Sequence, residues 1–161
     1  MTKIQILGSG CARCRQLTAV TEQAAQDLGL RYELEKVTDV ARYAIGVEVL
    51  RPDGQGGYKK VNAVVVPTGS VYGQEFKRIF HTAEDGMTDI LFVLYKGDSP
   101  NLVECEWLME AVISDLPPDR PRGKPVEVTL GYDYSGILRG SAVDLGTAKD
   151  CTFVVDRHKI E

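Results

Sequence analysis

The sequence has no long hydrophobic run and no cluster of positive charge. Its 19 Lys and Arg residues are scattered among 23 Asp and Glu residues, which gives a formal net charge of −4. Nucleic-acid binding draws its affinity from concentrated positive charge, so we expect no nucleic-acid partner. A membrane-spanning helix needs about 20 consecutive apolar residues, and the absence of such a stretch predicts no membrane partner.

The chain begins without the apolar region and small-residue cleavage site that mark a secretory signal. We therefore expect a cytoplasmic protein. Four cysteines are too few for a disulfide scaffold in 161 residues, which agrees with a reducing compartment. A chain of this length can bury roughly 70% of its unfolded surface, so disulfides are not needed to stabilise it.

Two kinds of catalytic machinery are missing from the sequence. It contains no glycine-rich loop of the type that cradles phosphates, so we expect no ATPase activity. Its carboxylates show no paired arrangement suited to acid and base catalysis, which gives no support to a hydrolase. We expect no cofactor and no metal site.

The first forty residues have the pattern of a βαβ unit. Apolar residues alternate over Lys3–Leu7, as in a strand, and alternate again around Tyr32 and Leu34. Between these segments one apolar stripe recurs at helical spacing and ends before Gly29, a suitable left-handed stop. The stripe consists of Leu17, Val20, Ala24 and Leu28.

From about Tyr43 onward the sequence predicts short strands separated by turns, as in an antiparallel sandwich or barrel. Four prolines between residues 117 and 125 predict a loop, and Gly140 is expected to weaken the strand that contains it. The predicted strands are Tyr43–Leu50, Tyr58–Val66, Glu75–Thr82, Thr88–Tyr95, Glu106–Ser114, Val126–Tyr132, Ile137–Asp144 and Asp150–Asp156.

Cys11 and Cys14 form a Cys-x-x-Cys pair between the first predicted strand and the helix. Unpaired amides at a helix N-terminus stabilise a thiolate, and Arg13 and Arg15 add positive charge. Cys11 is therefore the expected nucleophile towards a disulfide, and Cys14 is the expected resolving thiol.

Two other interpretations of this pair stay open. Both cysteines could be small buried residues, or they could supply half of a zinc site. Zinc would need two more ligands, and Cys105 and Cys151 lie far away in the sequence without a second Cys-x-x-Cys. We regard redox chemistry as the better interpretation.

Residues 1–38 resemble the opening of small bacterial thioredoxin-like redox-active disulfide proteins. The similarity rests on the segment from Lys3 to Cys11 and on Glu35–Asp39. The hairpin and last helix that complete the fold in that family have no clear counterpart here. The resemblance therefore implies a partial thioredoxin-like βαβ unit.

Residues 39–157 resemble the substrate-binding β domain of seventy-kilodalton heat-shock chaperones of the DnaK type, and residues 158–161 form a tail. The matching segments occur in the family's order: Asp39–Val40, Tyr43–Val49, Val65–Gly69, Phe80–Gly86, Leu116–Pro118, Pro121–Thr129, Gly136–Leu138 and Ser141–Asp144. Together the two resemblances imply a mainly β protein, in which a partial thioredoxin-like unit precedes an antiparallel β-sandwich.

The second resemblance implies that the sandwich holds an extended apolar polypeptide. The implied pocket is lined by Val47, Phe80, Ile90, Phe92 and Val126, with Leu50 and Ala83 arching over the peptide. No helical lid follows in the sequence, so we expect passive and rapidly reversible binding.

Three hypotheses for function follow. The first is a lidless, ATPase-less module that binds unfolded or extended apolar polypeptides and carries a possible redox-active pair. The second is a thiol–disulfide oxidoreductase that acts through Cys11 and Cys14, and the third is a non-catalytic fusion or chimera. A separate chaperone ATPase or a thioredoxin reductase would be a fitting partner. The half fold must also cover its sheet edge and helix stripe, by docking on the sandwich or by forming a homodimer.

Overall fold

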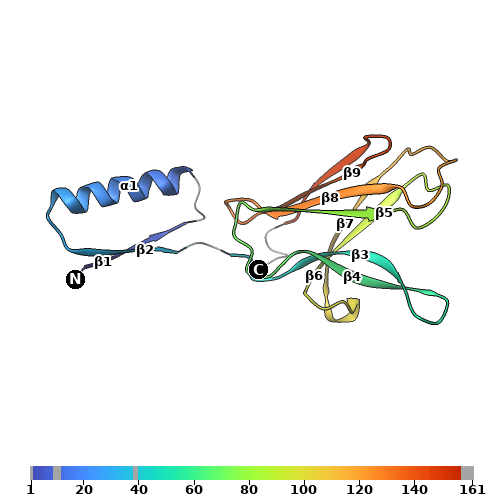
Figure 1. The fold of residues 1–161 in the computed structure, drawn as a ribbon, viewed down its shortest axis with the longest axis horizontal. Coiled ribbons are helices and arrows are strands. Elements are labelled where there is room, and N and C mark those ends of the chain that lie inside the picture. The colour runs from blue at the N-terminus through green and yellow to red at the C-terminus, as the bar shows by residue number, and fades with distance from the viewer. Residues whose placement is uncertain (1, 9–11, 38–39, 157–161) are drawn as a thin grey trace.

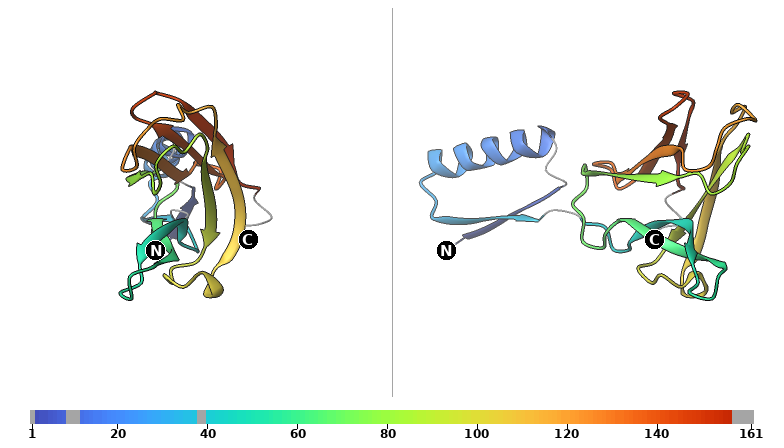
Figure 2. Two further views of the ribbon diagram at one scale, coloured as in Figure 1. Left: turned by 90° about the vertical axis from the view of Figure 1, so that its right-hand side faces the viewer. Right: turned by 45° about the vertical axis from the view of Figure 1, so that its right-hand side comes forward.

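The computed structural model describes residues 2–8, 12–37 and 40–156 (Figure 1). Within these ranges the protein is mainly β, with one α-helix, as the sequence predicts. Strand β1 (Thr2–Leu7), helix α1 (Ala12–Asp27) and strand β2 (Tyr32–Val37) form a unit beside the remaining strands (Figures 1 and 2).

The N-terminal unit is a βαβ motif, in which α1 connects two parallel strands. Ile4 of β1 lies opposite Leu34 of β2 in the two-stranded sheet. The helix ends at Asp27, and Gly29 follows with a φ of 63°, the left-handed conformation that glycine adopts readily. The local expectations for this segment are confirmed.

The apolar stripe of α1 does not face the sheet. The buried helix residues are the small Thr18 and Ala25, whereas Leu17, Val20 and Leu28 are 54%, 61% and 73% exposed. Periodicity placed these residues on one side of the helix correctly, but a two-stranded sheet is too narrow to cover that side. Docking on the sandwich, one of the two expected ways of covering the stripe, therefore does not occur in this structure.

The rest of the chain forms an antiparallel β-sandwich. One sheet has the strand order β4-β3-β6-β7, and the other has the order β10-β9-β8-β5. A short 3₁₀ helix, Leu102–Glu104, precedes β7. The strands are β3 (Ile45–Pro52), β4 (Tyr58–Val66), β5 (Glu75–His81), β6 (Ile90–Lys96), β7 (Glu106–Ile113), β8 (Pro125–Tyr132), β9 (Leu138–Asp144) and β10 (Asp150–Val154).

All eight predicted strands are present, with ends that differ from the prediction by no more than two residues. One proline was misplaced, because Pro125 is the first residue of β8 and not part of the preceding loop. Proline is tolerated at the first position of a strand, and the carbonyl of Pro125 still accepts a hydrogen bond from the Leu145 amide at 3.1 Å.

The core lies between the two sheets. Ile90, Phe92 and Leu94 alternate along β6 on its inner face, and Val126, Val128 and Leu130 do the same along β8. Burying these branched and aromatic side chains supplies the main driving force for folding of the sandwich. In the described ranges, no helix combines the length and the apolar character needed to cross a membrane.

Candidate functional site

Three of the residues proposed for a peptide pocket lie on the inner face of one sheet. Val47, Ile90 and Phe92 are 2%, 7% and 4% exposed and belong to the common core. Val47 in β3 lies opposite Leu94 in β6, so the two side chains share the face that Ile90 and Phe92 also occupy. Strand pairing thus brings together residues that are more than forty positions apart.

Two more residues of this set come from the opposite sheet. Phe80 at the end of β5 pairs directly with Val126 at the start of β8. Val126 is buried, whereas Phe80 is half-buried and packs against the rim of the core. The guanidinium carbon of Arg78 lies 5.8 Å from the centre of the Phe80 ring, a cation–π arrangement.

The two residues predicted to arch over a peptide lie at the surface. Leu50 is 45% exposed near the end of β3, and Ala83 is exposed in the loop that follows β5. β5 pairs antiparallel with β8 from Glu75 to His81, so the end of β5 lies at the start of β8, whereas β3 pairs with β6 only over Ile45–Val47. Ala83, which follows β5, therefore lies near the start of β8, where Val126 is.

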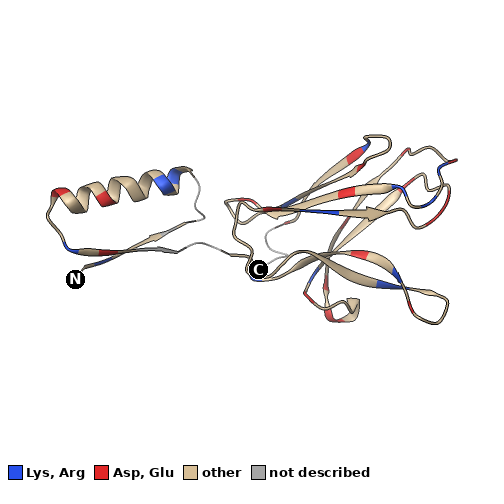
Figure 3. Cartoon of the chain, in the orientation of Figure 1, with Lys and Arg blue, Asp and Glu red and all other residues tan. Residues whose placement is uncertain are grey.

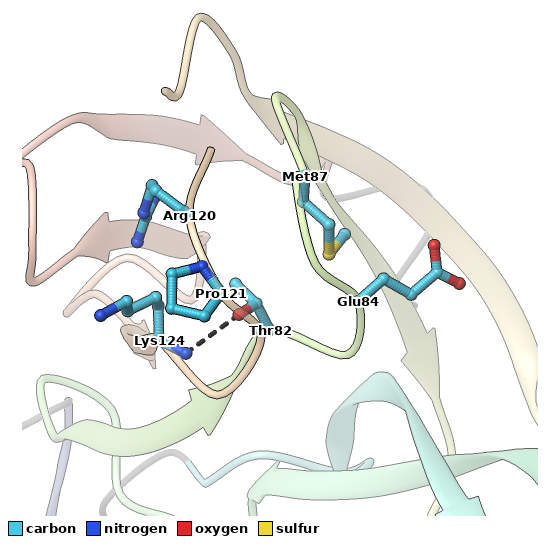
Figure 4. Close-up of a pocket in the computed structure, with 6 residues that line it drawn as sticks. All are labelled: Thr82, Glu84, Met87, Arg120, Pro121 and Lys124. Carbon is cyan, nitrogen blue, oxygen red and sulfur yellow. Dashed lines mark hydrogen bonds between the residues drawn. The ribbon is translucent and has the colours of Figure 1, made fainter. Parts of the chain in front are cut away.

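A shallow polar depression lies beside Ala83 (Figure 4). Its empty volume is about 150 Å³ and is open to solvent. The backbone amide of Lys124 donates a 3.0 Å hydrogen bond to the hydroxyl of Thr82 across it. The residues that line it are Thr82, Glu84, Met87, Arg120, Pro121 and Lys124. Sequence analysis did not identify this surface, because the two loops that form it meet only in the folded sandwich.

Hydrogen bonds hold these two loops together. The Gly86 amide donates to the Arg120 carbonyl at 2.8 Å, and the Arg122 amide donates to the Asp85 carboxylate at 2.7 Å. The Thr82 amide also donates to the Lys124 carbonyl at 3.0 Å. The loop that carries Ala83 is consequently anchored on both sides.

Of the two cysteines proposed for redox chemistry, Cys11 lies outside the described residues. Cys14 is half-buried in the first turn of α1, and its carbonyl accepts a hydrogen bond from the Thr18 hydroxyl at 2.9 Å. A side chain at Gly8, just after β1, would collide with the sulfur of Cys14, so glycine permits this close approach. Cys14 therefore lies at the start of the helix that follows β1.

The other two cysteines are remote from this unit. Cys105 precedes β7 and Cys151 lies in β10, and both are free thiols. Over residues 2–8, 12–37 and 40–156, no three side chains of His, Cys, Asp or Glu come together in a way that could hold a metal ion.

Comparisons with known proteins detect both sequence resemblances. Residues 2–51 match the family model described as a thioredoxin domain. The chain is 35% identical over 126 residues to the chaperone protein DnaK of Thermosipho melanesiensis, an alignment that covers 77% of this chain and 20% of that protein. The DnaK proteins of Thermosipho africanus and Thermotoga maritima are each 34% identical over the same shares.

The two matches differ in what they cover. The chain spans about a fifth of the length of the DnaK relatives. The thioredoxin match continues to residue 51, inside β3, so the domain boundary expected at residue 38 stays a prediction.

Proposed function

We propose that the sandwich of β3–β10 binds an extended apolar segment of another polypeptide. One apolar side chain of that segment would enter between the sheets, among Val47, Phe80, Ile90, Phe92 and Val126. Leu50 and Ala83 would contact the segment from the rim. The observation that carries the proposal is that Val47, Ile90, Phe92 and Val126, from both sheets, belong to one core cluster, against which Phe80 packs.

The chemistry of the site suits this ligand. The walls are aliphatic and aromatic, and a side chain that enters them exchanges water for apolar contacts. Since four of the five lining residues are less than 8% exposed, the ligand must displace the half-buried Phe80 to enter. The similarity to DnaK proteins over 77% of the chain supports the same role.

The test is fluorescence anisotropy with a labelled leucine-rich peptide and a matched peptide in which serine replaces leucine. We expect the wild type to bind only the leucine-rich peptide. Leu50→Asp should weaken binding at least about tenfold, or about 1.4 kcal/mol, because it puts a charge where the apolar segment lies. Leu50 is partly exposed, so this variant should still fold.

Val103→Asp is the matched control. Val103 is 91% exposed on the 3₁₀ helix before β7, and this variant should bind as the wild type does. Phe80→Ala should also weaken binding, with folding checked by circular dichroism. Equal affinity of the wild type, Leu50→Asp and Phe80→Ala for the leucine-rich peptide would refute the proposal.

A second candidate function is thiol–disulfide exchange at Cys11 and Cys14, supported by the position of Cys14 at the start of α1 and by the thioredoxin-domain match. The Cys11 thiolate would attack a client disulfide, releasing one client thiolate and forming a mixed disulfide. The Cys14 thiolate would then attack the Cys11 sulfur, releasing the second client thiol. The client gains two electrons and the cysteine pair loses two, so a thiol reductant such as a thioredoxin reductase system must regenerate it.

Reduction of insulin in the presence of dithiothreitol tests this second function. Cys11→Ser should abolish the acceleration, and Cys14→Ser should trap a mixed disulfide that mass spectrometry detects. The double variant Cys105→Ser/Cys151→Ser is the control and should retain full activity. A wild-type rate no higher than that of Cys11→Ser would exclude this function.

A further inference from the structure

Helix α1 presents an apolar stripe to solvent, formed by Leu17, Val20, Ala24 and the adjoining Leu28. Its three large side chains are each more than half exposed. Figures 1 and 2 show the sheet β1–β2 along one side of the helix and the sandwich away from it. Contiguous apolar surface of this kind is typical of an interaction site.

The spacing of the apolar residues along α1 suits packing against another helix. Steps of three, four and four residues keep the side chains on one narrow line along α1. Such a line forms the seam between two packed helices, where large residues of one helix fit beside small residues of the other. Leu17 and Ala24 provide one large and one small position on the same seam.

The charges of α1 are divided between its two ends. Arg13 and Arg15 lie in the first turn, whereas Glu22 and Asp27 lie in the second half (Figure 3). This order opposes the helix macrodipole, which favours acidic residues at the N-terminus and basic residues at the C-terminus. Opposite charges therefore lie at the two ends of α1.

We propose that this stripe is the contact between two copies of the chain, with the two α1 helices packed antiparallel about a two-fold axis near Val20. In this arrangement Arg13 approaches Asp27 of the partner subunit, and Leu17 packs beside Ala24 of the partner subunit. A parallel pair would instead place Arg13 against Arg13, which is repulsive. The antiparallel contact is self-complementary, as a two-fold interface requires.

The size of the contact sets the expected strength. Helix α1 has 16 residues and is about 24 Å long at 1.5 Å per residue. Two such helices bury less than the roughly 1,600 Å² of a standard interface. The dimer is consequently weak, and its population rises with protein concentration.

Sedimentation velocity on the full chain, in reducing buffer from low micromolar to near millimolar concentration, tests the proposal. The reducing buffer removes dimers linked by disulfides. We expect the wild type to shift towards dimer as concentration rises. Val20→Asp should remain monomeric over the whole range, while Val103→Asp, a matched change on an exposed residue elsewhere, should dimerise as the wild type does.

A charge exchange tests the antiparallel orientation. Arg13→Glu and Asp27→Arg should each weaken dimerisation several-fold, and the double variant should restore it. Circular dichroism would check that each variant keeps α1. A monomeric wild type, a dimer that survives Val20→Asp, or failure of the double variant to recover would each overturn the proposal.

Discussion

Arg120 donates a 2.6 Å hydrogen bond from Nη2 to Oδ1 of Asp144, whose side chain is fully buried. The other carboxylate oxygen of Asp144 accepts hydrogen bonds from the amide and the hydroxyl of Thr147, at 2.8 and 2.6 Å. This ion pair fastens the proline-rich loop before β8 to the turn between β9 and β10. It also supports one side of the depression beside Ala83.

Asp144 should make the stability of the sandwich depend on pH. Burial acts to raise its pKa, but the hydrogen bonds from Thr147 and Arg120 outweigh burial and hold the pKa below the ordinary value of 3.8. Because the folded pKa lies below the unfolded one, this stabilisation is complete above about pH 4 and is lost as pH falls through the folded pKa. Urea unfolding between pH 7 and pH 3 measures it.

Removing the charge of Asp144 should have a large effect. We expect Asp144→Asn to lower the free energy of unfolding by about 3 kcal/mol at pH 7, because Arg120 loses its partner in a nearly buried position. Its unfolding free energy should also change less between pH 7 and pH 3. Glu127→Gln, which removes the charge from the more exposed pair with Lys77, should change it by less than about 1 kcal/mol. Equal effects of the two substitutions would contradict this assignment.

Gly140 is required by packing, contrary to the expectation that glycine merely weakens β9. A β-carbon at this position would overlap the ring of Phe153 and the side chain of Leu130. We expect Gly140→Val to lower the free energy of unfolding by about 2 kcal/mol, as overpacking of a core does. Adding Phe153→Leu should recover part of that loss in thermal unfolding. A neutral or stabilising Gly140→Val would show that the ring moves aside freely.

Asn62 anchors the segment between β6 and β7 and protects Cys105. Its buried side-chain amide donates to the carbonyls of Gly97 and Ser99, at 2.9 and 3.1 Å. Burial raises the pKa of the Cys105 thiol and outweighs the 3.5 Å hydrogen bond from the Asn62 amide to Sγ, which lowers it. The raised pKa slows alkylation because the thiolate is the reactive form.

Asn62→Ala should therefore lower the free energy of unfolding by about 2 kcal/mol. It should also speed alkylation of Cys105 by iodoacetamide because the released segment exposes the thiol, although loss of the hydrogen bond to Sγ acts to raise the thiol pKa. Peptide mapping by mass spectrometry measures the rate at each thiol. Cys151, whose pKa burial also raises, is the internal control and should react at the wild-type rate. An unchanged rate at Cys105 would mean that Asn62 does not hold this segment.

Local sequence patterns predicted the helix and the strands well because these elements depend on preferences that act within a few residues. A β-rich run bounded by turn residues identified β4 as Tyr58–Val66 without error, and a glycine able to adopt positive φ identified the end of α1. The pairing of Phe80 with Val126 could not be derived in this way. It joins strands more than forty residues apart, and a shift of one residue would have turned either side chain to the other face.

The candidate pocket also combines features that the sequence predicts with features that only the fold decides. The family resemblance selected seven residues, and the structure places five in or against the core and two at its rim. No sequence pattern separates a core residue from a pocket residue, because both are apolar and face inward. Access to a ligand depends on which strand ends meet, and that is a long-range property.

By itself the sequence determined where strands, turns and the helix occur, since backbone preference and side-chain periodicity act over a few residues. Only the tertiary structure decided which apolar faces are covered. The inner faces of β6 and β8 pack together in the core of the sandwich, whereas Leu17 and Val20 on α1 and the adjoining Leu28 are exposed. The physical reason is that burial requires a second surface of matching width, and no local pattern states whether the folded chain supplies one.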